Sequence, residues 1–400
     1  MRNFIKSKKI CIIIENLLYG GVTTHLINLL NSKKFNDCEI TIITNSSNKP
    51  LKEALKNLKN KKVKIIYFLS LNNFILDNFL QKFFFHFLRP ILFFLSYFQM
   101  VKILRNKKFD TILANCGGFG SFRSEIAGIF AAKLLGYKNI NLLVHHNYTK
   151  SRFWKPILKF IELFLKYCVK NFIFVSYATK KSFLTNTGIS PNNSHNIHVI
   201  HNGITLKKIS KKKIHFFKNK QKKINVGMLS RIEEYKGQID LVEGFSRLSE
   251  KNKSRFKVFL IGDGSEKELL KLKQIINLKR LNRYFKIIGR INEDSLLILN
   301  NLDLFFSLTR DFEGFGYSIA ESLYVGVPVV STKVGGTVEF LNNQNSYLIK
   351  PKDPKTIARL LINFATHRKN WKKKAEKGKR LIISKFNSEE MAKKFYKIIF

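Results

Sequence analysis

A chain of 400 residues is too long for one compact core and fits two domains of ordinary size. With 45% apolar and 25% charged residues it is globular, and its four scattered cysteines exclude a disulfide framework or a cysteine metal site. A formal charge of +45 favours an anionic partner. No helix-turn-helix, zinc-finger or RNP signature accompanies it, so we expect no nucleic-acid partner and favour a membrane surface rich in anionic lipid.

The start of the chain predicts no secretory signal. Met1–Lys9 is followed by the strand-like Ile10–Ile14 without a small-residue cleavage site. The cysteines have the scattered spacing of small hydrophobic residues in a reducing compartment. We therefore expect a cytoplasmic protein.

The first half of the chain opens with an apolar strand, Lys8–Ile14, a glycine loop, Gly20-Gly21, and a helix, Val22–Leu30. This order is the opening of a nucleotide-binding type of α/β unit, although a lone pair of glycines also suits an ordinary tight turn. Further strands are predicted at Glu39–Thr44, Lys62–Leu69, Thr111–Asn115, Asn141–Val144 and Phe172–Val175. Ser176 is expected to cap the helix that follows the last of them.

Asn73–Leu104 is more aromatic than the rest of the chain. It contains Phe83, Phe84, Phe85, Phe87, Phe93, Phe94, Tyr97 and Phe98. The run is interrupted by Gln81, Lys82, His86, Arg89 and Pro90. A spanning helix needs about 20 apolar residues without charges, so we do not expect one here. Two interpretations remain: a pair of buried helices, or a helical hairpin in the membrane interface, where aromatic and basic side chains occur together.

Two neighbouring histidines follow the strand Asn141–Val144. A lone histidine is more often structural, but ligands bind at the carboxyl ends of parallel strands in open α/β sheets. A ligand-facing side chain is therefore expected at His146 or, if the strand end is placed one residue earlier, at His145.

The lysine-rich stretch 207–223 lacks apolar periodicity and is predicted to link two halves of the chain. Beyond it, strands are predicted at Ile224–Leu229, Phe256–Ile261, Phe285–Ile288 and Leu302–Leu308. The first three end in Ser230-Arg231, Gly262-Asp263-Gly264 and Gly289-Arg290. Because strands alternate with helices in both halves, we predict two doubly wound parallel sheets.

The most informative stretch follows the last of these strands. It reads Glu313-Gly-Phe-Gly-Tyr-Ser-Ile-Ala-Glu321, then Val327-Pro-Val-Val330 and Gly335-Gly336. We predict a glycine loop, a helix, a buried strand, and a second glycine loop that opens another helix. The first helix offers free N–H groups and a positive dipole end to an anion near Glu313, such as a sugar diphosphate.

The same two glutamates could instead be a glycosidase acid/base pair or solvated surface acids. The acid/base interpretation is poor, because Glu313 lies on a glycine loop and Glu321 within a helix, with no carboxylate facing them in the sequence pattern. The glycines and the G-x-P-V-V strand around the pair make the pattern far more specific than two glutamates alone.

The pattern E-G-F-G-x-x-x-x-E, with G-x-P-V-V and G-G behind it, resembles the donor-site signature of the retaining family 4 glycosyltransferases, the group 1 glycosyl transferases. The resemblance implies an α/β protein of the GT-B fold, with two Rossmann-like doubly wound parallel-sheet domains facing a central cleft. An acceptor-binding domain would occupy 1–206, the linker 207–223 and a nucleotide-sugar-binding domain 224–387. A C-terminal helix, 388–400, would return to the first domain.

Roles for individual residues also follow from this resemblance. Arg231 and Lys236 would clamp the donor diphosphate, where fixed cations stabilise the charge that grows on the leaving group. Glu313 would bind the transferred sugar, Glu321 the ribose, and His146 would face the donor sugar from the first domain. Further donor contacts are implied for Gly20, Gly21, Gly262, Arg290, Gly314, Phe315 and Gly316. Because the sequence has no Asp-x-Asp, we expect no metal and no other cofactor.

The implied function is a retaining transferase that moves a sugar from a UDP- or GDP-linked donor to a glycan or lipid-linked acceptor. Its place would be polysaccharide or lipopolysaccharide assembly at the inner face of the cell membrane. A sugar-nucleotide epimerase can share this architecture, but it needs acid/base carboxylates in the first domain, where the sequence shows no convincing set. A basic membrane- or nucleic-acid-binding protein without catalysis is the other alternative.

Overall fold

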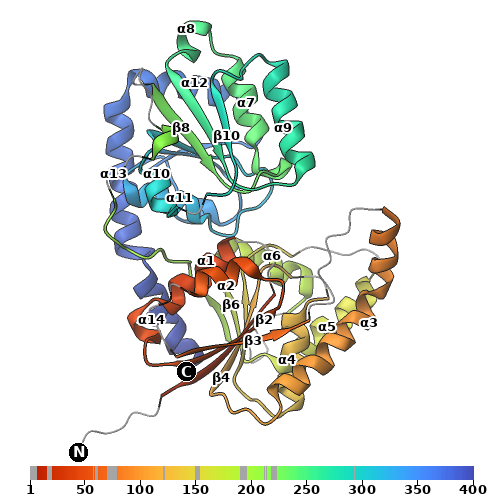
Figure 1. Ribbon diagram of the computed structural model, residues 1–400. Coiled ribbons are helices and arrows are strands. Elements are labelled where there is room, and N and C mark those ends of the chain that lie inside the picture. Colours follow the sequence, from red (N-terminus) through yellow and green to blue (C-terminus); the bar gives the residue numbers. More distant parts are fainter. Residues whose placement is uncertain are drawn as a thin grey trace, which may run out of the picture. The chain divides into compact units, whose positions relative to one another are not determined.

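The computed structural model describes residues 7–15, 20–56, 58, 62–69, 79–119, 122–148, 154–189, 196–210, 212, 214–217, 223–291 and 293–400. The chain forms two compact units, Met1–Thr205 with Ser388–Phe400, and Leu206–Asn387 (Figure 1). Each unit has its own parallel sheet covered by helices, which confirms the predicted α/β class with two doubly wound sheets.

The first unit is built on a seven-stranded sheet with the order β3-β2-β1-β4-β5-β6-β7. Its strands are β1 (Lys9–Ile14), β2 (Glu39–Asn45), β3 (Val63–Phe68), β4 (Thr111–Cys116), β5 (Ile140–Val144), β6 (Asn171–Phe174) and β7 (Asn196–Val199). All neighbours pair in parallel. Because β1 lies between β2 and β4, the chain changes direction there, and ligands of such sheets bind beyond the strand ends at this point.

Helices cover both faces of this sheet. One face carries α1 (Gly21–Leu30), α2 (Lys49–Leu55) and α14 (Ser388–Ile399), and the other carries α3 (Phe79–Leu104), α4 (Ser124–Leu134), α5 (Lys155–Cys168) and α6 (Tyr177–Thr187). A 3-10 turn, η1, spans Lys33–Phe35. Ser176 caps α6 as predicted, since its hydroxyl accepts the N–H of Thr179 at 3.1 Å.

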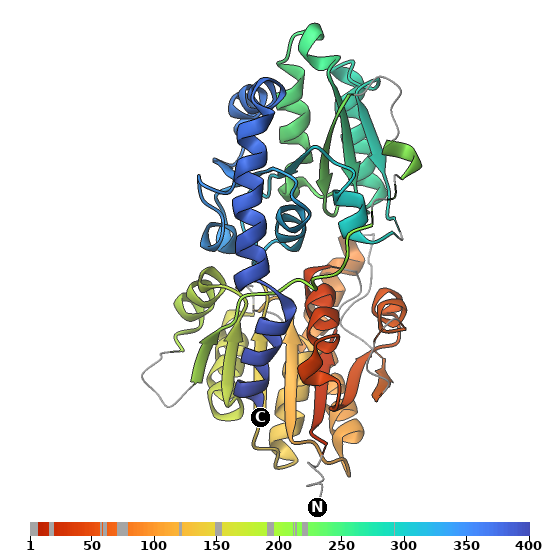
Figure 2. The same ribbon diagram turned by 90° about the vertical axis from the view of Figure 1, so that its left-hand side faces the viewer.

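The C-terminal helix α14 lies beside α1, so the end of the chain belongs to the first unit (Figure 2). Its Met391, Phe395 and Ile399 are buried in the same hydrophobic cluster as β1 and α1. Each large apolar side chain buried in this way contributes about 1.5–3 kcal/mol, which holds the terminal helix in place.

The aromatic segment forms one helix and not the hairpin or helix pair expected from the sequence. In its described part, α3 runs for 26 residues from Phe79 to Leu104, with Pro90 inside it. Phe93, Met100 and Leu104 on this helix are buried against the first unit. This packing beyond Pro90 offsets the single backbone hydrogen bond that a proline removes from a helix. The stretch 73–78 lies outside the described residues.

The second unit is built on a six-stranded sheet with the order β10-β9-β8-β11-β12-β13. Its strands are β8 (Ile224–Leu229), β9 (Phe256–Ile261), β10 (Phe285–Ile288), β11 (Leu304–Ser307), β12 (Val329–Thr332) and β13 (Tyr347–Ile349). Its helices are α7 (Gln238–Ser246), α8 (Glu250–Lys253), α9 (Glu266–Leu278), α10 (Ser295–Leu299), α11 (Tyr317–Val325), α12 (Pro354–Thr366) and α13 (Arg368–Lys385). Its 3-10 turns are η2 (His215–Phe217), η3 (Glu234–Lys236) and η4 (Gly335–Glu339). Gly335-Gly336 therefore opens a short 3-10 turn and not the predicted helix.

The described part of the lysine-rich stretch 207–223, predicted as the interdomain linker, packs on the second unit. Ile214 and Phe217 are buried, and the Phe217 ring lies 4.6 Å from that of Phe259 between centroids. The N–H of Ile214 also bonds Asn301 at 3.3 Å. A short apolar run between lysines is too brief to show periodicity, which is why the sequence did not reveal this packing.

Candidate active site

Loops at the carboxyl edge of the second sheet bring together the predicted catalytic residues of that unit. Arg231 follows β8, Glu313 follows β11, and Lys236 lies in η3 between β8 and α7. Strands β8 and β11 are neighbours at the point where the strand order reverses. In doubly wound sheets this position is the usual ligand site.

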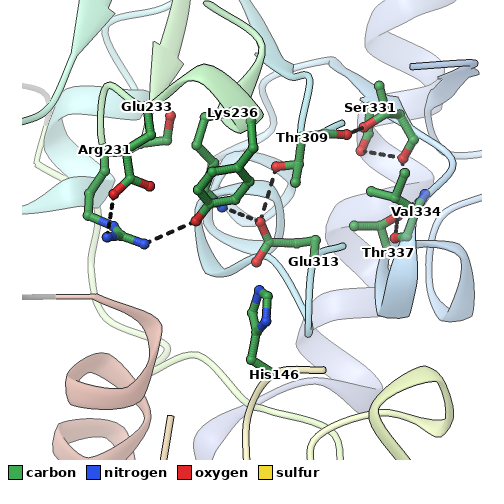
Figure 3. Close-up of polar contacts among 12 residues, drawn as sticks. His146, Arg231, Glu233, Lys236, Thr309, Glu313, Ser331, Val334 and Thr337 are labelled. Carbon is green, nitrogen blue, oxygen red and sulfur yellow. Dashed lines mark hydrogen bonds and ion pairs between the residues drawn. The ribbon is translucent and has the colours of Figure 1, made fainter. Parts of the chain in front are cut away.

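A direct ion pair joins Lys236 to Glu313. The ammonium lies 2.7 Å from Oε2 of the carboxylate, and the hydroxyl of Thr309 donates to the same oxygen at 3.2 Å (Figure 3). The Lys236 and Glu313 side chains are only 14% and 19% exposed. Two residues 77 apart in the sequence are thereby fixed in one geometry.

The environment of Lys236 keeps this side chain charged. Burial opposes the ammonium charge, but the Glu313 carboxylate and the Tyr235 hydroxyl outweigh burial and raise the pKa of Lys236. The ammonium also lies 4.9 Å from the centroid of the Tyr235 ring. The site therefore holds a fixed positive charge at neutral pH.

Arg231 is oriented by two partners that the sequence analysis did not single out. Its guanidinium donates to Glu233 at 2.6 Å through Nη1 and to the Tyr235 hydroxyl at 3.0 Å through Nη2 (Figure 3). Its side chain remains 41% exposed. A planar guanidinium held in this way presents the geometry that suits phosphate oxygens. The sequence did contain a signal for these partners, because Glu233 and Tyr235 lie within four residues of Arg231.

Gly237 fixes the position of the preceding lysine. Its φ is +77°, and a Cβ there would lie 2.2 Å from the carbonyl oxygen of Leu308 at the end of β11. Only glycine permits this approach, because other residues add both strain and a clash. Gln238 next to it donates to the Arg231 carbonyl oxygen at 2.8 Å. The η3 turn is thus anchored to both strand ends.

Gly335 fixes the backbone position of Glu313 in the same way. Its φ is +55°, and a Cβ would lie 2.2 Å from the carbonyl oxygen of Glu313 and 2.8 Å from its nitrogen. The N–H of Gly336 donates to that carbonyl oxygen at 2.7 Å. The predicted second glycine loop therefore supports the backbone of the first one.

The other predicted residues of the glutamate loop differ in their surroundings. Gly314 and Gly316 are buried, and Gly316, with φ +89°, directly precedes α11. The ring of Phe315 is 2% exposed and lies 4.9 Å from that of Phe340 and 6.0 Å from that of Phe386. Since its side chain belongs to this buried aromatic cluster, only the backbone of Phe315 is available for a ligand.

Glu321 lies on α11, the helix that follows the glutamate loop, and its side chain is half-buried. Burial raises the pKa of its carboxyl to about 7, with Asp294 acting in the same direction and Ser295 and Lys207 in the opposite one. Asp294 itself forms an ion pair with Lys207. Glu321 therefore changes its charge near neutral pH.

Two predicted residues lie at the ends of the neighbouring strands. Gly262, after β9, has φ +144°, and a Cβ would lie 2.0 Å from the carbonyl oxygen of Ser230. This glycine is required where the β8 and β9 ends approach each other closely. Arg290, two residues after β10, is exposed at the same edge of the sheet.

In the first unit, the structure distinguishes the two histidines. His145 is 7% exposed, its Nε2 lies 2.7 Å from Asn115 Oδ1, and its ring lies 4.7 Å from that of His25. Burial, together with the neighbouring His25 and His146, lowers the pKa of His145 well below its usual range. His146 is half-buried and bonds Asn147 through Nδ1. His145 is thus a core residue, and His146 is the one of the two that a ligand can reach.

Gly20 and Gly21 lie at the start of the first helix, which begins at Gly21 and not at the predicted Val22. Gly20 is the residue before α1, and its carbonyl oxygen accepts the N–H of Thr24 at 3.0 Å. No atom lies within 4 Å of a Cβ placed on Gly20. The N-terminus of α1 is therefore uncrowded on this side, among the residues that the structure describes.

A pair of carboxyl groups that the sequence analysis missed lies in the first unit. The N–H of Glu15, after β1, donates to Glu125 at 3.1 Å, and the N–H of Ser124 donates to Glu15 at 3.0 Å. Burial raises the pKa of Glu125 to about 7, while the nearby Arg123 lowers it and Glu15 raises it. Both glutamates are buried, at 3% and 0% exposure, and they tie β1 to the start of α4. This geometry suits a structural link rather than the acid/base pair of an epimerase.

Comparison with known protein families covers nearly the whole chain. The family model described as Glycosyltransferase Family 4 matches residues 19–208, and the model described as Glycosyl transferases group 1 matches residues 210–381. The junction between the two matches lies close to the boundary of the two compact units at Thr205 and Leu206.

Individual relatives agree with these matches. An uncharacterized glycosyltransferase of Methanocaldococcus jannaschii is 23% identical over 77% of this chain and 79% of its own length. The lipopolysaccharide core biosynthesis glycosyltransferase LpsE of Rhizobium meliloti is 25% identical over 43% of this chain and 48% of its own. The fold is similar to that of HepE of Anabaena, solved in complex with UDP and glucose, with a TM-score of 0.75, 17% identity and 98% coverage of both chains.

Proposed function

The chain belongs to the family 4 glycosyltransferases of the GT-B fold, and from this premise we propose its reaction. A sugar is moved from a UDP- or GDP-linked donor to a glycan or lipid-linked acceptor, and the new bond keeps the anomeric configuration of the donor. The arrangement that best supports this proposal is the carboxyl edge of the second sheet. There Arg231, the Lys236–Glu313 pair and the glycine loop before α11 lie together.

In the proposed reaction, the cations act on the leaving group. The bond between the anomeric carbon and the diphosphate oxygen breaks, and negative charge grows on the nucleoside diphosphate. Arg231 and Lys236 meet that charge with preorganised donors, which lowers the barrier more than it stabilises the ground state. The acceptor hydroxyl attacks from the same face and passes its proton to a departing diphosphate oxygen. We propose that this pair of cations takes the place of a divalent ion, so that no metal cofactor takes part.

Further contacts follow from the same assignment. Glu313 binds hydroxyls of the transferred sugar while Lys236 and Thr309 hold its carboxylate, and Glu321 binds the ribose. In the first unit, His146 is the residue proposed to face the donor sugar. The biological role proposed is cell-surface polysaccharide or lipopolysaccharide assembly, which the name of the Rhizobium relative supports by analogy.

A donor screen tests the proposal. Incubation with a panel of UDP- and GDP-sugars is expected to hydrolyse one donor slowly, with water in place of the acceptor. Proton NMR of the first-formed sugar, read before mutarotation, should show the anomeric configuration of the donor, and EDTA should leave the rate unchanged.

Other products of the same screen would point to other functions. An inverted sugar would refute the retaining mechanism, and an isomerised sugar nucleotide would indicate an epimerase. If no donor is turned over and UDP, GDP and inorganic diphosphate raise the melting temperature equally, the protein is a polyanion binder. A nucleotide at a hundred times its Kd should stabilise a true donor site by about 2.7 kcal/mol.

Donor affinity should depend on pH through Glu321. With its pKa raised to about 7, the carboxyl is neutral below that pH and ionised above it. The ionised form accepts stronger hydrogen bonds from ribose hydroxyls. The affinity for UDP-glucose, measured by titration calorimetry, is therefore expected to rise between pH 6 and pH 8, by at most about tenfold from the change in ionised fraction.

The matched control for this titration is Glu321→Gln, in which the side chain cannot change its charge. Its affinity should be weaker at pH 8 than that of the natural protein, and its pH dependence should be flat. An unchanged pH profile in Glu321→Gln would assign the dependence to another group, such as His146.

A further inference from the structure

We propose that the outward face of α3 and α5 in the first unit binds the surface of a membrane that contains anionic lipid. This α3–α5 face is defined by Ile91, Phe94 and Phe98 on α3 and by Phe160, Phe164 and Tyr167 on α5. The proposal goes beyond the transfer reaction and does not depend on it, because it rests on exposed side chains of helices that carry none of the candidate active-site residues.

Helix α3 is apolar on two opposite faces. Phe93, Ser96, Met100 and Leu104 are buried against the first unit. The other side shows Ile91, Phe94 and Phe98, of which Phe94 is 60% and Phe98 64% exposed. Residues spaced by three and four positions share one side of a helix, so these three form a stripe. A helix that faces only water on its outer side carries polar residues there, so this stripe needs another explanation.

Helix α5 repeats the pattern. Its Leu158, Ile161 and Leu165 are buried, whereas Phe160 is 71% and Tyr167 75% exposed, with Phe164 between them in the same stripe. The two helices lie on the same side of the sheet, and α4 packs against both of them.

Ring contacts link the two helices through α4. Phe130 of α4 lies 4.9 Å from Phe164 of α5 and 6.0 Å from the buried Phe93 of α3 between ring centroids. The Phe93 ring in turn lies 6.2 Å from that of the exposed Phe94, and exposed Leu134 adds apolar surface on α4. Large contiguous apolar patches on a protein surface mark contact with a partner or a membrane.

The charges around this face identify the partner. Among the described side chains of α3, α4 and α5, the exposed charged residues are all basic: Lys102, Lys133, Lys155 and Lys159. The two acidic residues of these helices, Glu125 and Glu162, are both buried. An aromatic surface on helices whose exposed, described charged side chains are all basic matches the interface of an anionic leaflet, where aromatic rings lie at headgroup level and lysines meet the lipid charge. A protein partner with an apolar, acidic face is a less economical explanation, since nothing else in the described chain points to one.

Helix α3 also has the length and composition of a membrane-spanning helix. Within the described residues, Phe87–Leu104 is long and apolar enough to cross a bilayer by these two properties alone. Its inner side, however, is packed against α4, with Phe93, Met100 and Leu104 buried in the first unit. We therefore place α3 along the membrane surface rather than across it. Such a surface would keep the first unit beside a lipid-linked acceptor.

Sedimentation with vesicles tests the proposal without any donor or acceptor. The purified full-length protein is mixed with vesicles of neutral phosphatidylcholine, or of phosphatidylcholine with phosphatidylglycerol, at low and high salt. Binding is expected only with the anionic lipid, and it should weaken as salt rises. Double substitution Phe98→Ser with Phe160→Ser should reduce the bound fraction severalfold. The double substitution Lys102→Glu with Lys159→Glu should lower the partition coefficient of the protein onto the vesicles by about fivefold or more per residue.

The controls lie on α9 of the second unit, which carries exposed aliphatic and basic side chains. Leu278→Ser removes an apolar side chain that is 82% exposed, and Lys267→Glu with Lys273→Glu removes two exposed cations. These variants should bind vesicles like the unchanged protein. All variants should keep the far-UV circular dichroism of the parent, because every substituted side chain is exposed.

Four outcomes would overturn the proposal. These are no vesicle binding at low salt, equal binding to neutral lipid, an equal loss of binding in the α9 controls, and a shift from dimer to monomer in Phe98→Ser with Phe160→Ser. The last of these, seen by light scattering, would show that a second copy of the chain covers the face. Donor hydrolysis in solution should be unchanged in the face variants, so failure of membrane binding and failure of the transferase proposal are distinguishable.

Discussion

Replacing Arg231 by alanine, or Glu313 by glutamine, is expected to lower kcat on the order of a hundredfold or more. Arg231 is aimed by Glu233 and Tyr235, and Glu313 is held by Lys236 and Thr309, so each is a preorganised group. A group that is fixed before the reaction needs no reorganisation when charge develops in the transition state. Its removal is therefore expected to lower kcat. Steady-state kinetics with the donor identified in the screen, at saturating concentration, measures the effect.

A matched control exists in the same unit. Arg283 forms an ion pair with Glu250 on the surface, where both side chains are more than half exposed. Exposed pairs contribute about 0–1 kcal/mol to stability and none to a distant reaction, so Arg283→Ala should keep near-native turnover. If Arg231→Ala and Glu313→Gln also kept near-native turnover while folded, the assignment of the site would be wrong.

Substitution Gly335→Ala is the second change with a large expected effect. The new Cβ would meet the carbonyl oxygen of Glu313 at 2.2 Å and its nitrogen at 2.8 Å, so the Glu313 backbone must move. A displacement of about 1 Å in a catalytic group can cost about a hundredfold in rate, and we expect a loss of kcat of this order. Kinetics and thermal unfolding of the same preparation separate the loss of activity from a loss of folding.

Gly326→Ala isolates the cause of that loss. Gly326 also has a positive φ, +83°, but no atom lies within 4 Å of its ideal Cβ. Both substitutions therefore carry the backbone strain of a left-handed alanine, about 1 kcal/mol, whereas only Gly335→Ala displaces Glu313. Equal loss of turnover in the two variants would mean that strain, and not the position of Glu313, controls activity.

The sequence predicted three strands of the second unit closely. β8, β9 and β10 have the bounds that their largely apolar runs indicate, whereas β11 is shorter than the predicted Leu302–Leu308 and β13 was not predicted. The glycine motif with its two glutamates was also sufficient to identify the family. The resemblance could be recognised from sequence because the loop needs glycines at fixed positions, such as Gly335 against the Glu313 backbone.

Local sequence could not predict features that depend on distant contacts. Alone, α3 suggested a hairpin or a pair of helices, yet its packing on α4 carries one helix through Pro90. The short apolar run at Ile214–Phe217 was hidden among lysines until its contact with Phe259 was known. In both cases the stabilising partner lies elsewhere in the chain, so periodicity gave the wrong or an incomplete answer.

The amino-acid sequence by itself therefore determined the α/β class, the two doubly wound sheets and the family, because apolar periodicity and glycine spacing are local properties. Only the tertiary structure showed that Lys236 pairs with Glu313 over 77 residues, that Glu233 and Tyr235 orient Arg231, and that His145 is buried while His146 is accessible. It also decided that aromatic residues lie on both sides of one helix: among the described side chains of α3, Phe93 is buried, whereas Phe94 and Phe98 are exposed. Burial and pairing are relations between segments brought together by the sheet order, and no single segment contains them.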